Sequence, residues 1–322
     1  PSETVTLPIP LQELFARRFN RLDRLPQRVA ELLTVLARPV PLGELAVLAD
    51  LPPDRCALAV DQLVDSRLAR IDRGMVAIRH QLFRSAFYRR ITPARVAMLH
   101  ERIAEHLLRG ASAPSAGELA VHFSRAGRAA EAAGYGRAAA DVAVENGAAS
   151  EAAYFLELVV ENEMDEHERA RATGDLAQLL HANRQMARAG PLLEVASDRL
   201  RRVGRPDRAM RMSVRRVDSR AEVDGIPLSA SVARLAEIKE EARNREDWEA
   251  VAVALDTELH LLHQAGDVDA IHALFEQVRE CATKDDPAAA CLAHSSLALN
   301  ILFGDPDEAL ASFGRIDDLI GR

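Results

Sequence analysis

The second half of the sequence carries turn signals at a nearly constant interval. With Gly147, Asn183, Gly225, Gly266 and Gly304 as markers, the intervals are 36, 42, 41 and 38 residues. Each marker lies between two runs that have apolar residues at helical spacing. The predicted helix pairs are 128–145 with 148–161, 165–181 with 185–203, 206–223 with 229–244, 247–264 with 268–283, and 287–303 with 306–320. A helix hairpin cannot bury its apolar face alone, so this series of hairpins predicts an α-solenoid in which neighbours stack.

A different pattern precedes the repeats. Short strands are predicted on either side of the turn Asp72-Arg73-Gly74, and three helices come before them. The predicted helices are 26–37, 42–48 and 54–64, and the predicted strands are 68–71 and 75–78. This order of elements is that of a winged helix-turn-helix. An amphipathic helix over 11–25 is expected before it, and a connecting helix within 115–125 after it.

Charge is distributed unevenly along the chain. Residues 11–110 carry a formal charge of +6 and residues 111–322 one of −13, although the whole chain has a net charge of −8. A basic N-terminal part and an acidic C-terminal part support a domain boundary near Gly110. The acidic overall balance does not favour a nucleic-acid-binding protein.

The segment that joins the last predicted strand to the next helix carries a recognisable pattern. It reads Arg79, His80, Leu82, Phe83, Arg84, Ala86, Phe87 and Tyr88. It resembles the R-H-x-L-h-R-x-A-h-Y pattern (h, apolar) that ends the winged helix of STAND-type regulatory ATPases. In the related NB-ARC proteins a Met-His-Asp motif stands here, and its His reaches the phosphates of bound ADP. The resemblance implies that His80, with Arg79 beside it, senses the ADP phosphates in the full-length protein. Gln81 stands where Asp is usual, and the alternative role for His80 is local packing or capping.

The helix hairpins resemble tetratricopeptide (TPR) repeats of the longer kind found in MalT-like sensors. A small residue, a large apolar residue and another apolar residue recur at +5, +9 and +12 from the turn. The first hairpin has Ala152, Leu156 and Val159 at these places, and the last has Ala309, Phe313 and Ile316. In the second hairpin Arg188 occupies the +5 place, so the register drifts in the middle of the array.

Together these features predict a mainly α chain in four parts. They are a linker helix (1–25), a winged-helix domain with its following helices (26–110), a connecting helix (111–126) and a solenoid of five TPR-like hairpins (127–322). The combination resembles the sensor region of a STAND-type, ATP-dependent transcriptional regulator of the LuxR family, without its ATPase core. Because no G-x-x-x-x-G-K-[ST] loop is present, we expect no enzyme activity and no cofactor in this chain. ATP or ADP is implied only for the full-length protein.

The resemblance also implies partners. These are the ATPase core of the same polypeptide and an inducer, either a small molecule or a protein, in the groove of the repeats. Self-association as a homo-oligomer is left open. Two alternatives remain: a protein-interaction scaffold without any nucleotide link, and DNA binding through the third helix of the wing. Asp54, Asp61 and Asp65 against one Arg55 in that helix disfavour direct DNA contact.

Several other features have plain structural explanations. His260 and His263 lie three residues apart, but a third metal ligand at a suitable spacing is missing. The acidic stretch 161–168 fits a solvated hairpin junction, His122 fits a packing residue, and Trp248 fits the core or a groove contact. Three cysteines without C-x-x-C spacing, no apolar run of membrane length and no signal peptide indicate a cytoplasmic protein. The abrupt start at Pro1 suggests a piece of a longer protein.

Overall fold

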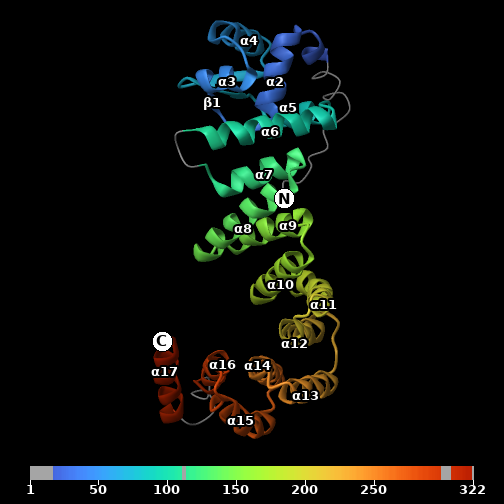
Figure 1. Ribbon diagram of the computed structural model, residues 1–322, viewed down its shortest axis with the longest axis vertical. Coiled ribbons are helices and arrows are strands. Elements are labelled where there is room, and N and C mark those ends of the chain that lie inside the picture. Colours follow the sequence, from blue (N-terminus) through green and yellow to red (C-terminus); the bar gives the residue numbers. More distant parts are fainter. Residues whose placement is uncertain (1–16, 111–113, 299–305, 321–322) are drawn as a thin grey trace. The chain divides into compact units, whose positions relative to one another are not determined.

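The computed structural model describes residues 17–110, 114–298 and 306–320, and the chain is mainly α (Figure 1). It divides into two compact units, residues 1–142 and 143–322. The predicted helix over 11–25 lies partly outside the described residues; residues 17–20 are helical, and a new helix begins at Arg24. None of the described helices combines the length and the apolar composition that a membrane crossing requires.

The first unit contains a small antiparallel sheet packed among helices. Its elements begin with α2 (Arg24–Leu36), β1 (Val40–Pro41), α3 (Leu42–Ala49), α4 (Pro53–Asp65), β2 (Ala69–Asp72) and β3 (Met75–Ile78). The strand order is β1-β3-β2, and β3 pairs antiparallel with both neighbours. The three helices and two strands expected from the sequence are all present. The sequence analysis missed β1, because two prolines flank its single buried residue, Val40, and prolines usually break strands.

The core of the first unit is continuous from the sheet to the helices that follow it. Val76 of β3 is buried in the same cluster as Leu33 of α2, and Phe87 and Ile103 join that cluster from two later helices. These helices are α5 (Gln81–Tyr88) and α6 (Pro93–Arg109). Helix α6 has Thr92 at the N-cap position and Pro93 in its first turn. Two more helices, α7 (Ala116–Ala126) and α8 (Ala129–Glu145), follow α6.

The second unit is an array of helix hairpins. Its helices are α9 (Ala149–Asn162), α10 (Glu166–Ala182), α11 (Met186–Arg202), α12 (Pro206–Val223), α13 (Leu228–Asn244), α14 (Trp248–Ala265), α15 (Val268–Ala282), α16 (Pro287–Ala298) and α17 (Pro306–Ile320). They agree with the predicted helix pairs to within a few residues at most ends; α16 is described only to Ala298. Figure 1 shows them following one another as a stack rather than around one central core.

Packing in this unit runs between neighbours. The first helices of successive hairpins contact each other, α10 with α12, α12 with α14 and α14 with α16. The N-terminal half of α14 is covered almost completely, since Ala250 to Leu255 are all buried. This is the TPR-like α-solenoid that the repeat interval predicts.

Backbone geometry explains why most of the residues that mark the repeat interval are glycines. Gly225 and Gly266 have φ values of 64° and 72°, a left-handed conformation that favours glycine. Asn183 is not the left-handed residue of its turn; Arg184 is, with φ 56°. The Asn183 side chain instead donates a hydrogen bond to the Leu179 carbonyl and so caps the end of α10. Gly304 lies outside the described residues.

One close approach between helices makes a testable stability prediction. A Cβ on Gly190 of α11 would lie 2.9 Å from the Ser219 hydroxyl of α12, which donates a buried hydrogen bond to the Met186 carbonyl. Gly190→Ala should therefore displace Ser219 and destabilise the contact between α11 and α12 by about 1–3 kcal/mol, measured by hydrogen exchange of the amides of these helices. The matched control is Gly174→Ala in α10, where the new Cβ would be 3.5 Å from Leu200, an ordinary contact. Equal stability of the two variants would contradict the prediction.

Candidate functional site

His80 lies where β3 passes into α5. Its backbone is extended, with φ −138° and ψ 140°, and it occupies the N-cap position of α5 without a side-chain capping bond. The amide of the preceding residue, Arg79, donates to the Leu68 carbonyl at 2.9 Å and so ties the segment to the sheet. Both side chains are exposed. The segment thus has a fixed backbone and two side chains directed away from the core.

Aromatic packing fixes the helix that His80 begins. The rings of Phe83 and Phe87 are stacked 6.3 Å apart, and Phe19 lies 4.8 Å from Phe87. The His80 ring is 5.6 Å from that of Phe83, its only ring contact in the described chain. Of the two alternative roles of His80, local packing is observed in part, because its ring lies beside that of Phe83. Capping is not observed, because the His80 side chain forms no capping hydrogen bond.

The polar groups of this segment fit an anion. Within the described residues, Arg79 and Arg84 form no ion pair, and the His80 ring nitrogens form no hydrogen bond. Guanidinium and imidazole N–H groups that are not engaged by carboxylates suit phosphate oxygens. Arg79 and His80 thus offer exposed N–H donors that have no carboxylate partner in the described chain.

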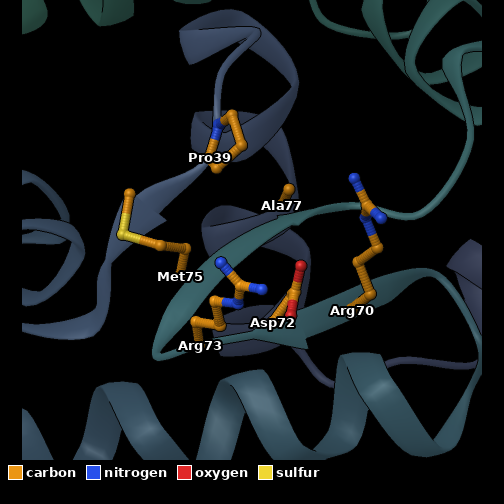
Figure 2. A pocket seen from close by; sticks show the side chains of 6 residues that line it. All are labelled: Pro39, Arg70, Asp72, Arg73, Met75 and Ala77. Carbon is orange, nitrogen blue, oxygen red and sulfur yellow. The ribbon is translucent and has the colours of Figure 1, made fainter.

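A shallow hollow lies on the face of the sheet that points away from the core. It has a volume of about 170 Å³ and is lined by Pro39, Arg70, Asp72, Arg73, Met75 and Ala77. Figure 2 shows the three charged side chains on the same side of the hairpin as Met75 and Ala77. Alternation along β2 and β3 places these residues on one face, because Ala69 and Val76 occupy the buried face. The sequence analysis did not identify this surface.

A second hollow, which we call the arginine hollow, is formed by α2, α3 and α6. It has a volume of about 180 Å³ and is lined by Arg28, Leu32, Leu48, Ala49, Leu51, Arg95, Met98, Leu99 and Arg102. Arg95 pairs with Glu31 at 2.5 Å, and Arg102 donates to the Leu48 carbonyl at 3.1 Å, near the end of α3. Arg28 is exposed and forms no ion pair in the described chain. The sequence analysis missed this site, since its residues come from three separated segments.

The third helix of the predicted winged helix corresponds to α4, which presents an acidic surface. Cys56, Val60 and Leu63 face the core, whereas Asp54, Asp61 and Asp65 are exposed. Carboxylates repel the phosphates of a duplex, so this face is unsuited to a DNA groove.

Two buried histidines meet between α6 and α7. The Nδ1 atoms of His100 and His122 lie 2.8 Å apart, and the Nε2 atom of His100 lies 3.1 Å from the Tyr88 hydroxyl. A hydrogen bond between two Nδ1 atoms needs one proton, so the two neutral rings adopt different tautomers. Burial lowers the pKa of His100 to about 3, and the neighbouring His122 and Arg125 act in the same direction. Burial also lowers the pKa of His122 to about 4, although Glu118 opposes the shift. His122 is the packing residue that the sequence indicated.

Polar pairs connect the first helices of successive hairpins. His181 of α10 contacts Asp218 of α12 at 2.9 Å, and Ser296 of α16 donates to Asp256 of α14 at 2.9 Å. Asp218 is buried, which by itself raises the pKa of its carboxyl, but the bond from His181 and the nearby charges lower it overall. These pairs fix neighbouring hairpins relative to each other.

Two other residues that the sequence analysis considered, His260 and Trp248, contact neighbouring side chains. His260 is exposed and its Nε2 lies 2.8 Å from the amide nitrogen of Gln264. In the described chain no group of three His, Cys, Asp or Glu side chains could hold a metal ion. Trp248 is half-buried, and the Lys284 ammonium lies 4.1 Å from the centre of its ring.

Comparison with known proteins gives only distant similarity. No family model matches the chain, and no curated protein matches it. Among solved structures, the chain is similar to a STAND protein with a tetratricopeptide repeat sensor from Pyrococcus horikoshii, at 12% identity and a TM-score of 0.37, covering 98% of this chain. This chain spans about half, 53%, of that protein's length. It is also similar to BtubC from P. vanneervenii, at 16% identity and a TM-score of 0.38, covering 71% of this chain and 88% of that one.

Proposed function

We propose that this chain is the non-catalytic sensor and relay region of a larger ATP-dependent transcriptional regulator of the STAND type. The TPR-like hairpins would bind an inducer or a protein partner. The first unit, which we assign as a winged helix, would pass the bound state to an ATPase core of the same polypeptide. The observation that supports this most is the tethered segment Arg79–His80, whose backbone is held by the sheet while its side chains remain available to an anion.

The relay needs a nucleotide contact that depends on the wing. In the full-length protein the His80 ring would donate to a phosphate of ADP, with the Arg79 guanidinium beside it. A ligand in the repeats would act by preferring the state in which this contact is broken. Among the alternatives, DNA binding through α4 receives no support from its exposed aspartates. In the alternative, a protein-interaction scaffold without a nucleotide link, the first unit would only cap the helical array and His80 would not contact ADP.

Titration of ADP tests this role in a longer polypeptide that includes the ATPase core. A hydrogen bond to a charged group contributes about 1.5–3 kcal/mol, so His80→Ala should weaken ADP binding at least about tenfold, measured by calorimetry. The matched control is His272→Ala, because His272 is also exposed and has its ring 6.0 Å from a phenylalanine three residues later. Equal ADP affinity of wild type and His80→Ala would favour the scaffold.

A further inference from the structure

The turn between α9 and α10 carries an unusual apolar side chain. Met164 is 76% exposed, more than any other large apolar residue of the described chain. It lies in a segment that we call the acidic turn, which comprises Glu161, Glu163, Asp165, Glu166 and Glu168 around it. An exposed methionine among carboxylates serves no packing purpose within its own unit.

Hydrogen bonds hold the acidic turn in one conformation. Asp165 caps α10 by accepting from the amides of His167 and Glu168, at 2.8 and 3.0 Å. The Arg169 side chain donates to the Glu163 carbonyl at 2.8 Å. Because the turn is already ordered, docking of Met164 would cost little conformational entropy.

The carboxylates of the turn differ in their availability. Glu166 and Glu168 pair with arginines of their own helix, at 3.5 and 3.7 Å. Glu161 and Glu163, which both precede Met164, form no ion pair with a cation in the described chain, although Glu163 accepts a hydrogen bond from the Asp165 amide at 3.0 Å. The turn thus offers one apolar side chain beside two carboxylates that have no cationic partner.

The arginine hollow of the first unit has the complementary chemistry. Its floor is apolar, with Leu48 and Leu51, and Met98 on its rim is 43% exposed. Three arginines surround that floor and only one of them, Arg95, is neutralised by a carboxylate. A hollow with an apolar floor and two uncompensated guanidinium groups suits a methionine flanked by carboxylates.

We propose that the acidic turn of one copy of this chain docks in the arginine hollow of a second copy. Met164 packs on Leu51 and Met98, and Glu161 and Glu163 face Arg28 and Arg102. The charges of +6 over residues 11–110 and −13 over residues 111–322 orient the two copies as they approach. Because the two surfaces differ, each contact leaves one hollow and one turn free, and assembly continues beyond the dimer unless a ring closes.

Sedimentation velocity on the full chain tests this contact. The wild type should associate as protein concentration rises, and raising ionic strength from about 0.05 M to about 0.5 M should reverse the association, because salt screens exposed charges. Met164→Ser and Arg28→Glu should each weaken the association at least about tenfold. Both residues are exposed, so neither substitution disturbs the core. The control is Leu58→Ser on α4, which removes a 60% exposed apolar side chain outside the hollow and should change nothing.

Reversing the charge on each of the two surfaces distinguishes this contact from non-specific association. Arg28→Glu and Glu161→Arg variants should each associate at least about tenfold more weakly than the wild type when alone, and the two should associate when mixed. In that mixture the intact arginine hollow of the Glu161→Arg variant can receive the intact acidic turn of the Arg28→Glu variant. A wild type that stays monomeric at every concentration would overturn the proposal. So would association that is indifferent to Met164→Ser and Arg28→Glu, because another surface would then be responsible.

Discussion

Replacing Lys239 with alanine should destabilise the centre of the helical array by about 3–5 kcal/mol, the loss typical of a buried ion pair that keeps only one partner. Lys239 is 4% exposed and its ammonium lies 2.5 Å from the Glu258 carboxylate, which is 6% exposed. The pair joins α13 to α14, the helices at which two successive hairpins meet. Without the ammonium, the Glu258 carboxyl group would stay in its buried site without its ionic partner.

Hydrogen exchange is the suitable measurement, because repeat arrays do not unfold in a single step. The amides of α13 and α14 should lose protection in Lys239→Ala, while those of α10 should keep it. The matched control is Lys284→Ala, the other lysine of the chain, whose ammonium is at a half-buried site beside Trp248. Lys284→Ala should lower the local stability of the array by no more than about 1 kcal/mol.

A double substitution examines the cause of the loss. In Lys239→Met with Glu258→Leu neither charge remains, and the volume of both side chains is largely kept. Such replacements are often neutral or stabilising, so most of the protection should return. A double variant as unstable as Lys239→Ala would mean that shape, rather than the uncompensated charge, determines the effect.

Acidification should destabilise the first unit through the pair His100 and His122. Both pKa values are lowered in the folded protein, to about 3 and about 4, whereas an unfolded histidine titrates near pH 6.5. Below that pH the unfolded chain binds more protons than the folded one, so stability falls as pH falls. The contribution of the two neutral histidines to stability is complete above about pH 6.5 and is lost progressively as the pH falls towards 3–4. When the pH falls from 7 to 5.5, these two residues together should lower the free energy of unfolding by about 2–3 kcal/mol.

Urea unfolding followed at the two pH values measures this loss. His100→Leu with His122→Leu removes both titrating groups, and the difference in stability between the two pH values should shrink by the stated amount. His106→Leu is the control, since His106 also lies on α6 but is partly exposed and 3.8 Å from Glu44. An unchanged pH dependence in the double variant would assign the effect to other groups.

The helices of this chain could be predicted from its sequence because their signals are local. Apolar spacing, prolines at helix starts and left-handed glycines at turns are each read within about ten residues, and they placed most helix ends within a few residues. The predicted His80 segment was located for the same reason, since strand, His80 and helix are consecutive. A local pattern does not tell what His80 contacts, so its role stays a prediction.

Sites that combine distant segments could not be predicted. The arginine hollow needs α2, α3 and α6 in contact, and the histidine pair joins two helices across 22 positions. Lys239 did leave a signal, because it lies at helical spacing with Leu235, Ile238 and Ala242, on the stripe that faces the core. A charged residue on such a stripe requires a buried partner. The sequence does not tell which of the many acids is that partner.

The helices α10, α12, α14 and α16 each contact the next in the series rather than a shared centre. Such a chain can gain or lose whole hairpins by gene duplication or deletion, because no single core must be rebuilt around the change. The length of the array, and with it the size of the surface offered to a partner, can therefore evolve independently of the unit that contains His80.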